Sequence, residues 1–186
     1  MKPKHLLVIG SLLSVFQLMS QDHEAKYFRG KAEDSLEVMN KLSMARGVYN
    51  IQDYDSVISI SETILTRSLD IDFVRGVGES YFLKARALNR MGSRNKAIEM
   101  YRKALGYFES LNDHQRMACA YNNLGLILKA MGKFREAIEA GENALEYASG
   151  EPHSKLFFNI LINVGVVCPE PTGVLFTLMI KTPFHC

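Results

Sequence analysis

The sequence repeats itself every 40 residues. When residues 38–77, 78–117 and 118–157 are aligned, the segment 52–58 falls on 92–98 and on 132–138. The pairs Ile64-Leu65, Ala104-Leu105 and Ala144-Leu145 coincide in the same alignment. A fixed period of this size indicates stacked units, because each unit can bury its apolar face only against a neighbour. The period therefore predicts a repeat architecture and argues against a compact catalytic domain.

Each repeat contains two helical stretches with a turn between them. In the third repeat, Tyr121, Leu124, Gly125 and Leu128 occupy positions i, i+3, i+4 and i+7, which places them on one face of a helix. Gly132 interrupts this stretch, because glycine adopts a positive φ easily just past a helix end. A second apolar stripe follows, made of Phe134, Ala137, Ile138, Gly141, Ala144 and Leu145. We therefore expect an all-α fold, a right-handed α-solenoid of stacked antiparallel helix pairs.

The third repeat also carries a recognisable motif. Its residues Asn123-Leu124-Gly125, Gly132 to Ile138 and Ala144-Leu145 resemble the tetratricopeptide repeat, a helix–turn–helix unit of 34 residues. The 40-residue period adds about six residues after the second helix, Phe108 to Asp113 in the second repeat, and is similar to the long-helix bacterial members of the family. The resemblance departs from the family pattern at Gln52, where glycine is usual, and at Asn95, where an aromatic residue is usual.

The period divides the chain as follows. We predict a signal peptide over 1–20, a polar lead-in helix or linker over 21–37, a divergent first repeat over 38–77, a second over 78–117 and a third over 118–157. A fourth begins on schedule over 158–168, where Asn163-Val164-Gly165 reproduces the motif at Asn123. Pro169 and Pro171 then prevent a helix from continuing. We interpret 169–186 as an irregular tail, frame-shifted or prematurely ended. A short strand or a membrane-contacting tail stays open as the alternative.

The first 20 residues have the composition of a secretory signal. Lys2 and Lys4 precede the apolar stretch from Leu6 to Met19, which is shorter than the ~20 residues that span a bilayer as a helix. Ser20 supplies a small residue before a polar start. We therefore expect a secreted or periplasmic protein, with an uncleaved anchor or a buried N-terminal helix as the alternative.

The charge balance constrains the partners. The chain has 22 basic and 20 acidic side chains, and Lys2 and Lys4 account for the whole difference. A neutral body favours neither nucleic acid nor an anionic membrane as a partner. We also find no phosphate-binding glycine loop, no zinc-binding histidine pair and no nucleophile elbow in the sequence. The five histidines are scattered, and the three cysteines form no metal pattern. We expect no enzyme activity, no metal and no cofactor.

The resemblance implies a binding surface instead. In tetratricopeptide folds the first helix of each unit lines a concave groove for peptides or partner helices. Carried onto this register, the groove residues are Arg46, Asn50, Glu79, Phe82, Arg86, Asn89, Asn122, Asn123, Leu126, Lys129, Asn159 and Asn163. Asparagine at position 123 resembles the family asparagine that bonds a bound peptide's backbone, and a carboxamide can donate and accept at once. A merely solvated helix face is the alternative interpretation of these polar residues.

Three functions agree with these observations. The first is a non-catalytic exported scaffold that binds a protein or an extended peptide through the groove. The second is the N-terminal sensory part of a longer bacterial signalling protein, a histidine kinase or a transcriptional regulator, in which membrane attachment would belong to the parent chain. The third is a cytoplasmic peptide-responsive regulator.

Overall fold

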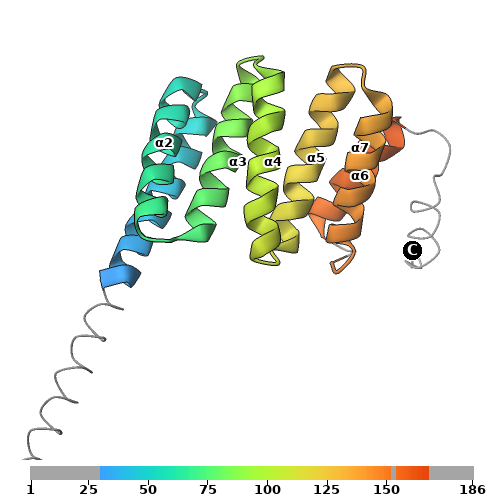
Figure 1. Cartoon of the computed structure of the whole chain (residues 1–186). Coiled ribbons are helices and arrows are strands. Elements are labelled where there is room, and N and C mark those ends of the chain that lie inside the picture. The colour runs from blue at the N-terminus through green and yellow to red at the C-terminus, as the bar shows by residue number, and fades with distance from the viewer. Residues whose placement is uncertain (1–29, 152–153, 168–186) are drawn as a thin grey trace, which may run out of the picture.

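A computed structural model describes residues 30–151 and 154–167 of the chain as a row of antiparallel helices (Figure 1). The predicted signal peptide over 1–20 and the predicted tail over 169–186 lie outside the described residues. The fold is all-α, with neighbouring helices packed in pairs as in a tetratricopeptide solenoid. In the described part of the chain, no helix combines the length and apolar character needed to cross a membrane.

From α2 to α6 the helices begin at intervals of 20 residues, half of the sequence period. The described part of the first helix covers residues 30–50. It is followed by α2 (Tyr54–Asp70), α3 (Val74–Arg90), α4 (Arg94–Ser110), α5 (His114–Ala130), α6 (Phe134–Ala148) and α7 (Lys155–Val167). Residues 30–37, which we expected to form a separate lead-in helix or a linker, continue into the helix of the first repeat. The residues added relative to a 34-residue unit lengthen the helices, because Phe108 to Ser110 form the last turn of α4.

The turns share one backbone geometry. The middle residue of each three-residue turn has a positive φ, at Gln52, Asp72, Gly92, Asn112 and Gly132. In the turn after α3, the Gly92 N–H donates to the Asn89 carbonyl and the Ser93 N–H donates to the Leu88 carbonyl. This is the Schellman arrangement, which satisfies the last carbonyls of a helix. The same two bonds recur after α4 and α5, so turns within a repeat and turns between repeats are built alike.

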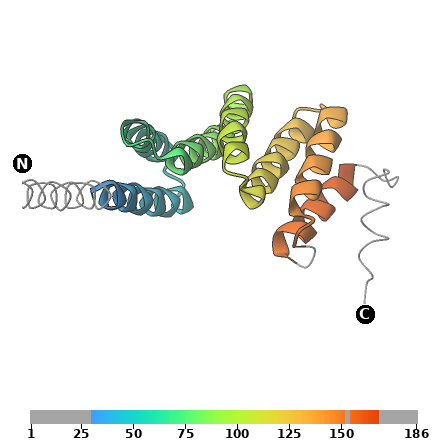
Figure 2. The ribbon, with the colours of Figure 1, turned by 60° about the horizontal axis from the view of Figure 1, so that its bottom comes forward.

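The helices form two layers, which the turned view of Figure 2 shows as a zigzag. We call the first helix, α3, α5 and α7 the odd layer, and α2, α4 and α6 the even layer. The central core lies between α3, α4, α5 and α6 and contains Phe82, Tyr101, Phe108 and Leu124. Small residues set the distance between the layers. A Cβ on Gly125 of α5 would lie 3.2 Å from the Ala137 carbonyl oxygen of α6.

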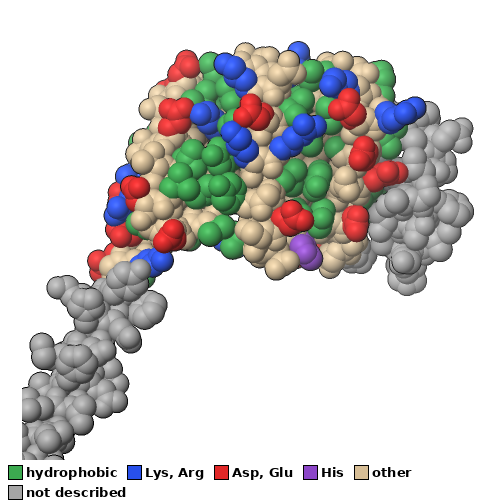
Figure 3. Space-filling model, viewed as in Figure 1, with side chains coloured by type: hydrophobic (Ala, Val, Ile, Leu, Met, Phe, Trp, Pro, Cys, Tyr) green, Lys and Arg blue, Asp and Glu red, His purple; other side chains and the backbone are tan. Residues whose placement is uncertain are grey.

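The even-layer face mixes charges of both signs with apolar areas (Figure 3). Two stacked tyrosine pairs join the layers at equivalent repeat positions. The Tyr81 and Tyr107 rings have their centroids 5.8 Å apart, and the Tyr121 and Tyr147 rings have theirs 5.7 Å apart. The His114 ring also lies beside Tyr147, with 5.7 Å between the ring centroids. Aromatic pairs at this spacing add to the stability of each helix pair.

Candidate functional site

The predicted groove residues all lie on the odd layer, because the period fixes which helix of each pair they occupy. Arg46 and Asn50 belong to the first helix, residues 79–89 to α3, residues 122–129 to α5, and Asn159 and Asn163 to α7. Side chains bridge consecutive helices of this layer. Arg46 and Arg116 both reach Glu79 of α3, and Asn163 reaches Asn122 of α5. The odd layer is therefore joined across its helices by polar contacts.

Two of the predicted groove residues are buried. Glu79 is 2% exposed and Phe82 is 5% exposed. Phe82 points into the core, where its ring packs edge-on against Tyr101 with 5.5 Å between centroids. Glu79 is enclosed by the two arginines that bond it. Neither side chain offers a surface to a partner, in contrast to the expectation from the register.

A charged cluster surrounds Glu79. The Arg46 Nη2 atom lies 3.1 Å from Glu79 Oε2, and the Arg116 Nε atom lies 2.6 Å from Glu79 Oε1. The Arg116 guanidinium also lies over the Phe82 ring, 5.8 Å from its centroid. A buried carboxylate needs such partners, since an unpaired charge in the interior would cost several kcal/mol. Each carboxylate oxygen therefore has its own arginine.

Arg86 lies in a different environment. It is half-buried, and its guanidinium carbon is 4.0 Å from the centroid of the Tyr49 ring. Among the described residues, no carboxylate forms an ion pair with Arg86. A cation–π contact stabilises the guanidinium without neutralising its charge. Arg86 thus keeps a positive charge at a partly desolvated position.

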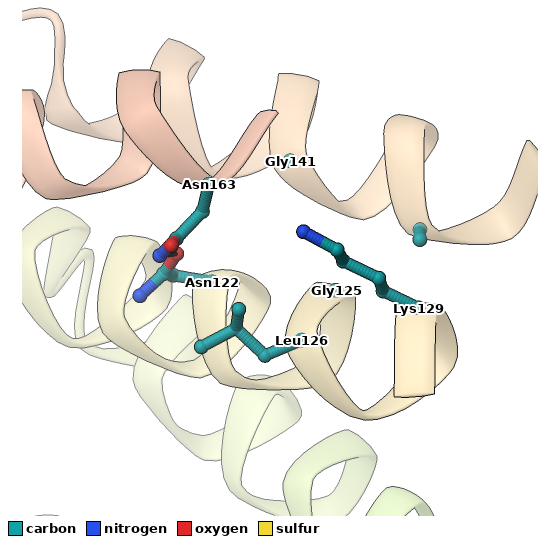
Figure 4. A pocket seen from close by; sticks show the side chains of 7 residues that line it. Asn122, Gly125, Leu126, Lys129, Gly141 and Asn163 are labelled. Carbon is teal, nitrogen blue, oxygen red and sulfur yellow. Dashed lines mark hydrogen bonds between the residues drawn. The ribbon is translucent and has the colours of Figure 1, made fainter. Parts of the chain in front are cut away.

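A small hollow opens between α5, α6 and α7 (Figure 4). Its volume of about 10 Å³ holds roughly one water molecule. It is lined by Asn122, Gly125, Leu126, Lys129, Ala137, Gly141 and Asn163. Four of these residues, Asn122, Leu126, Lys129 and Asn163, were predicted groove residues. Gly125 and Gly141 leave the space open because they have no side chains.

The two asparagines of the hollow face each other. The Asn163 Nδ2 atom donates to Asn122 Oδ1 across 2.9 Å. This bond leaves the Asn122 amide N–H groups and the Asn163 carbonyl oxygen for other partners. Lys129 extends its ammonium toward the same space (Figure 4). The arrangement can bond both the C=O and the N–H of a peptide group.

Other predicted residues differ in their availability. Asn50 is exposed, Asn89 is half-buried, and Leu126 is 38% exposed on α5. Asn123 donates from Nδ2 to the Cys119 carbonyl of its own helix across 2.8 Å. One donor of Asn123 is therefore satisfied within α5. The resemblance to the peptide-binding asparagine of the family stays a prediction.

The register did not single out Tyr49 or Arg116. Tyr49 directly precedes the predicted Asn50, and its position on the odd face is visible from helical spacing alone. Arg116 had no such signal, since the equivalent positions 76 and 156 hold glycine and leucine. It reaches the site because its long side chain extends from the first turn of α5 toward α3.

The packing between the layers also holds a thiol, Cys119 of α5, and a phenol, Tyr101 of α4. Burial raises the pKa of the Cys119 thiol, and the nearby Arg116 guanidinium opposes that rise. Burial likewise raises the pKa of the Tyr101 phenol. Both groups are therefore held in their neutral forms. Among the described residues, no group of three histidine, cysteine, aspartate or glutamate side chains is placed to hold a metal ion.

Comparisons with known proteins bear on this architecture. The sequence model of the tetratricopeptide repeat family matches residues 75–150. Among solved structures, the chain is similar to aspartyl phosphate phosphatase F from Bacillus subtilis, with 14% identity and a TM-score of 0.66 over 77% of this chain and 38% of that one. It is also similar to BtubC (BKLC) from P. vanneervenii, with 21% identity and a TM-score of 0.59 over 82% of this chain and 70% of that one.

The solved structures show the fold of this chain. The chain spans less than half the length of the Bacillus subtilis protein. A comparison with curated protein sequences finds no match. At 14% and 21% identity, the solved structures share the fold of this chain and carry no further assignment. The match to the tetratricopeptide repeat model covers the second repeat and most of the third, residues 75–150 of this chain.

Proposed function

We propose that this chain is a non-catalytic, exported scaffold that binds a protein or an extended peptide along its odd layer. Tetratricopeptide folds are typically interaction scaffolds, which supports the general role. The observation that carries the proposal is the alignment of polar side chains on consecutive odd-layer helices. Arg46, Asn50, Arg86, Asn89, Asn122 and Lys129 are exposed or half-buried there and lie along the array rather than around one point.

Such an arrangement suits an extended ligand. Amide side chains can bond a peptide backbone without selecting its sequence, and charged side chains between them supply selectivity. The hollow between α5, α6 and α7 adds an amide donor and an amide acceptor, without partners among the described residues, beside the Lys129 ammonium. A helix face that is merely solvated does not require two amides and an ammonium group to lie side by side.

The experiment compares one odd-layer variant with one even-layer variant, whose charge changes are equal in size and opposite in sign. Lys129→Glu reverses the cation beside the hollow, and Glu139→Lys reverses an exposed charge on α6. Tagged wild-type and variant proteins are purified from the source organism, and co-purifying proteins are quantified by mass spectrometry. We expect at least one partner to be lost with Lys129→Glu and retained with Glu139→Lys. An identical partner set for all three proteins would contradict binding through the odd layer.

Export is supported by the composition of residues 1–20. Cell fractionation of a C-terminally tagged copy, with mass spectrometry of its N-terminus, tests it. We expect the protein outside the cytoplasm and an N-terminus near Gln21. A cytoplasmic protein that retains Met1 would instead favour the peptide-responsive regulator.

A further inference from the structure

The turns within the second and third repeats lie at the same edge of the array. They join α3 to α4 and α5 to α6, and Figure 1 shows both at the upper end of the helices, opposite the turns between repeats. Because α4 packs against α5, the two turns belong to neighbouring helix pairs. We call residues 87–97 and 127–137, the two turns with the adjoining helix ends, the intra-repeat edge.

The intra-repeat edge carries an excess of positive charge. It contains six cations and a single acidic residue, Glu136, whose carboxylate lies 3.4 Å from the Lys133 ammonium. The equivalent stretches at the opposite edge, 67–77 and 107–117, contain three cations and four acidic residues. The excess therefore belongs to one edge only. Its cations are Arg90, Arg94, Lys96, Lys129, Lys133 and Arg135.

The stability of the helices does not explain these cations. Lys129 is half-buried and the other five are exposed. Among the residues that the structure describes, only Lys133 of the six forms an ion pair. Arg94, Lys96 and Arg135 lie in the first turns of α4 and α6, where the helix dipole disfavours positive charge. A side chain that opposes its own helix and pairs with nothing is available to a partner.

Large apolar side chains are exposed between the cations. Met91 directly follows α3 and is 45% exposed, and Phe134 begins α6 and is 57% exposed. Figure 3 shows Lys and Arg side chains beside apolar side chains along this upper edge. The edge therefore combines two kinds of group, cations that attract an anion and apolar groups that gain free energy on leaving water.

The surface of an anionic bilayer matches both kinds of group. Its phosphates attract lysine and arginine, and apolar side chains that stand among the cations can enter the boundary between headgroups and acyl chains. A nucleic acid supplies the phosphates but no apolar layer for Met91. The neutral total charge of the chain gave no sign of this surface, because the excess at one edge is balanced elsewhere.

We propose that the intra-repeat edge of the second and third repeats binds the surface of an anionic phospholipid bilayer. The cations contact lipid phosphates, and Met91 and Phe134 enter the interface, so that the helices stand upright on the membrane. This role goes beyond the proposed scaffold function and does not depend on it. The odd layer stays open to a partner, and Lys129 alone is shared by the two surfaces.

The first experiment is co-sedimentation of the full-length chain with sucrose-loaded vesicles. Vesicles of equal parts phosphatidylglycerol and phosphatidylcholine are compared with pure phosphatidylcholine at about 0.1 M salt, where charges interact over about 10 Å. Arg94→Gln/Lys96→Gln removes two cations of the edge, and we expect affinity for the anionic vesicles to fall about fivefold per cation. Arg102→Gln/Lys103→Gln removes two cations from the middle of the same helix and should cost clearly less. Equal losses would reduce the effect to net charge and overturn the proposal.

The second experiment locates the contact. The chain has no tryptophan, so a single tryptophan reports on its own position. Met91→Trp places it at the intra-repeat edge, and Leu69→Trp places it at the opposite edge, where Leu69 is 54% exposed. On anionic vesicles we expect blue-shifted emission and quenching by brominated lipid for Met91→Trp only. All variants share residues 1–20, so binding through that segment alone would leave the two tryptophans alike, and this result would reject the edge as the contact.

The apolar contribution is measured with the same vesicles. Phe134→Ala should lower the affinity about tenfold, since a phenylalanine side chain loses its apolar environment, while Leu69→Ala should change nothing. Equal affinities of these two variants would contradict insertion at the edge. Tighter binding of a single-stranded oligonucleotide or of a glutamate-rich peptide than of the vesicles would assign the edge to a different partner. Circular dichroism verifies that each variant is folded, and if Phe134→Ala is not, the tryptophan comparison decides.

Discussion

Gly78 provides the sharpest test of how the two layers pack. It lies on α3, and a Cβ built at this position would be 2.9 Å from Phe108 Cε1 and 3.2 Å from the Tyr107 Cβ of α4. Phe108 is fully buried, and its ring packs edge-on against Phe82 with 6.1 Å between centroids. The ring therefore has little room to give way. Gly78→Ala forces α3 and α4 apart.

Two opposing terms set the magnitude. Alanine is better than glycine inside a helix by about 0.5–1 kcal/mol, because the unfolded chain loses less conformational freedom. Overpacking in a close-packed interior costs about 1–3 kcal/mol. We therefore expect Gly78→Ala to lower the free energy of unfolding by about 1 kcal/mol. Gly106→Ala is the matched control, since Gly106 is an exposed position inside α4 with no atom within 4 Å of an added Cβ.

The assay is thermal and urea unfolding followed by far-ultraviolet circular dichroism. Gly106→Ala gains only the helix term, so its Tm should rise by about 2–4 °C, while that of Gly78→Ala should fall by a similar amount. Because repeat arrays can unfold in stages, the slope of the urea transition is compared as well as its midpoint. Phe108→Leu supplies the second arm. It makes room beside Gly78, so the cost of Gly78→Ala should largely disappear in the double variant.

The reasoning fails if Gly78→Ala raises the Tm as much as Gly106→Ala does. In that case α3 and α4 would accommodate a methyl group freely, and the close approach at position 78 would not affect the free energy of unfolding. A Gly78→Ala cost that persists unchanged beside Phe108→Leu would also contradict it, because the clash would then not involve the Phe108 ring.

Three further substitutions and one thiol measurement have defined outcomes. Gln52→Gly should stabilise the chain by about 1 kcal/mol in urea unfolding, since Gln52 has a φ of 66° that glycine adopts more easily. Ser68→Ala should stabilise it by a similar amount, because the buried Ser68 hydroxyl has no hydrogen-bond partner among the described residues. Asp113→Ala should cost about 1 kcal/mol in the same assay, since Asp113 caps α5 by accepting from the Arg116 N–H. Burial raises the pKa of Cys119, so its thiol should react with a disulfide reagent more slowly in the folded than in the urea-unfolded chain, with Cys119→Ala as background. For the same reason the free energy of unfolding should fall as the pH rises above the ordinary thiol pKa, because the unfolded chain then loses its proton first.

The sequence predicted the helix pairs, but not that the turns within and between repeats share one backbone geometry. The turns within the repeats were predicted from the 40-residue period, together with Gly92 and Gly132. The turns between repeats have the same backbone, yet Asp72 and Asn112 occupy their positive-φ positions. Aspartate and asparagine adopt this conformation more readily than most residues, which is why they replace glycine here. A 20-residue spacing of glycine, asparagine, aspartate and glutamine was therefore readable in principle, although no single residue type marks it.

The register identified the layer of each candidate residue but not its exposure. Glu79 and Phe82 lie on the predicted helix, yet both are buried by side chains of neighbouring helices. Their burial depends on Arg116 and Tyr101, which differ from the residues at equivalent positions in the other repeats. A repeat alignment does not show the effect of such differences, because it compares only what the repeats have in common. Exposure along the odd layer is a property of particular side-chain contacts, and these follow from the three-dimensional packing.

The last described helix, α7, has a large side chain at a repeat position where α3 and α5 have small ones. An added Cβ on Gly78 would meet the Phe108 ring, and the equivalent Ala118 shares an apolar cluster with Ala148. The next equivalent position on α7 is Phe158, which is 43% exposed. Ile162 beside it is 64% exposed, whereas its equivalent Phe82 is buried against α4. A helix that packs on this face of α7 must therefore present a small side chain opposite Phe158, the reverse of the arrangement at Gly78.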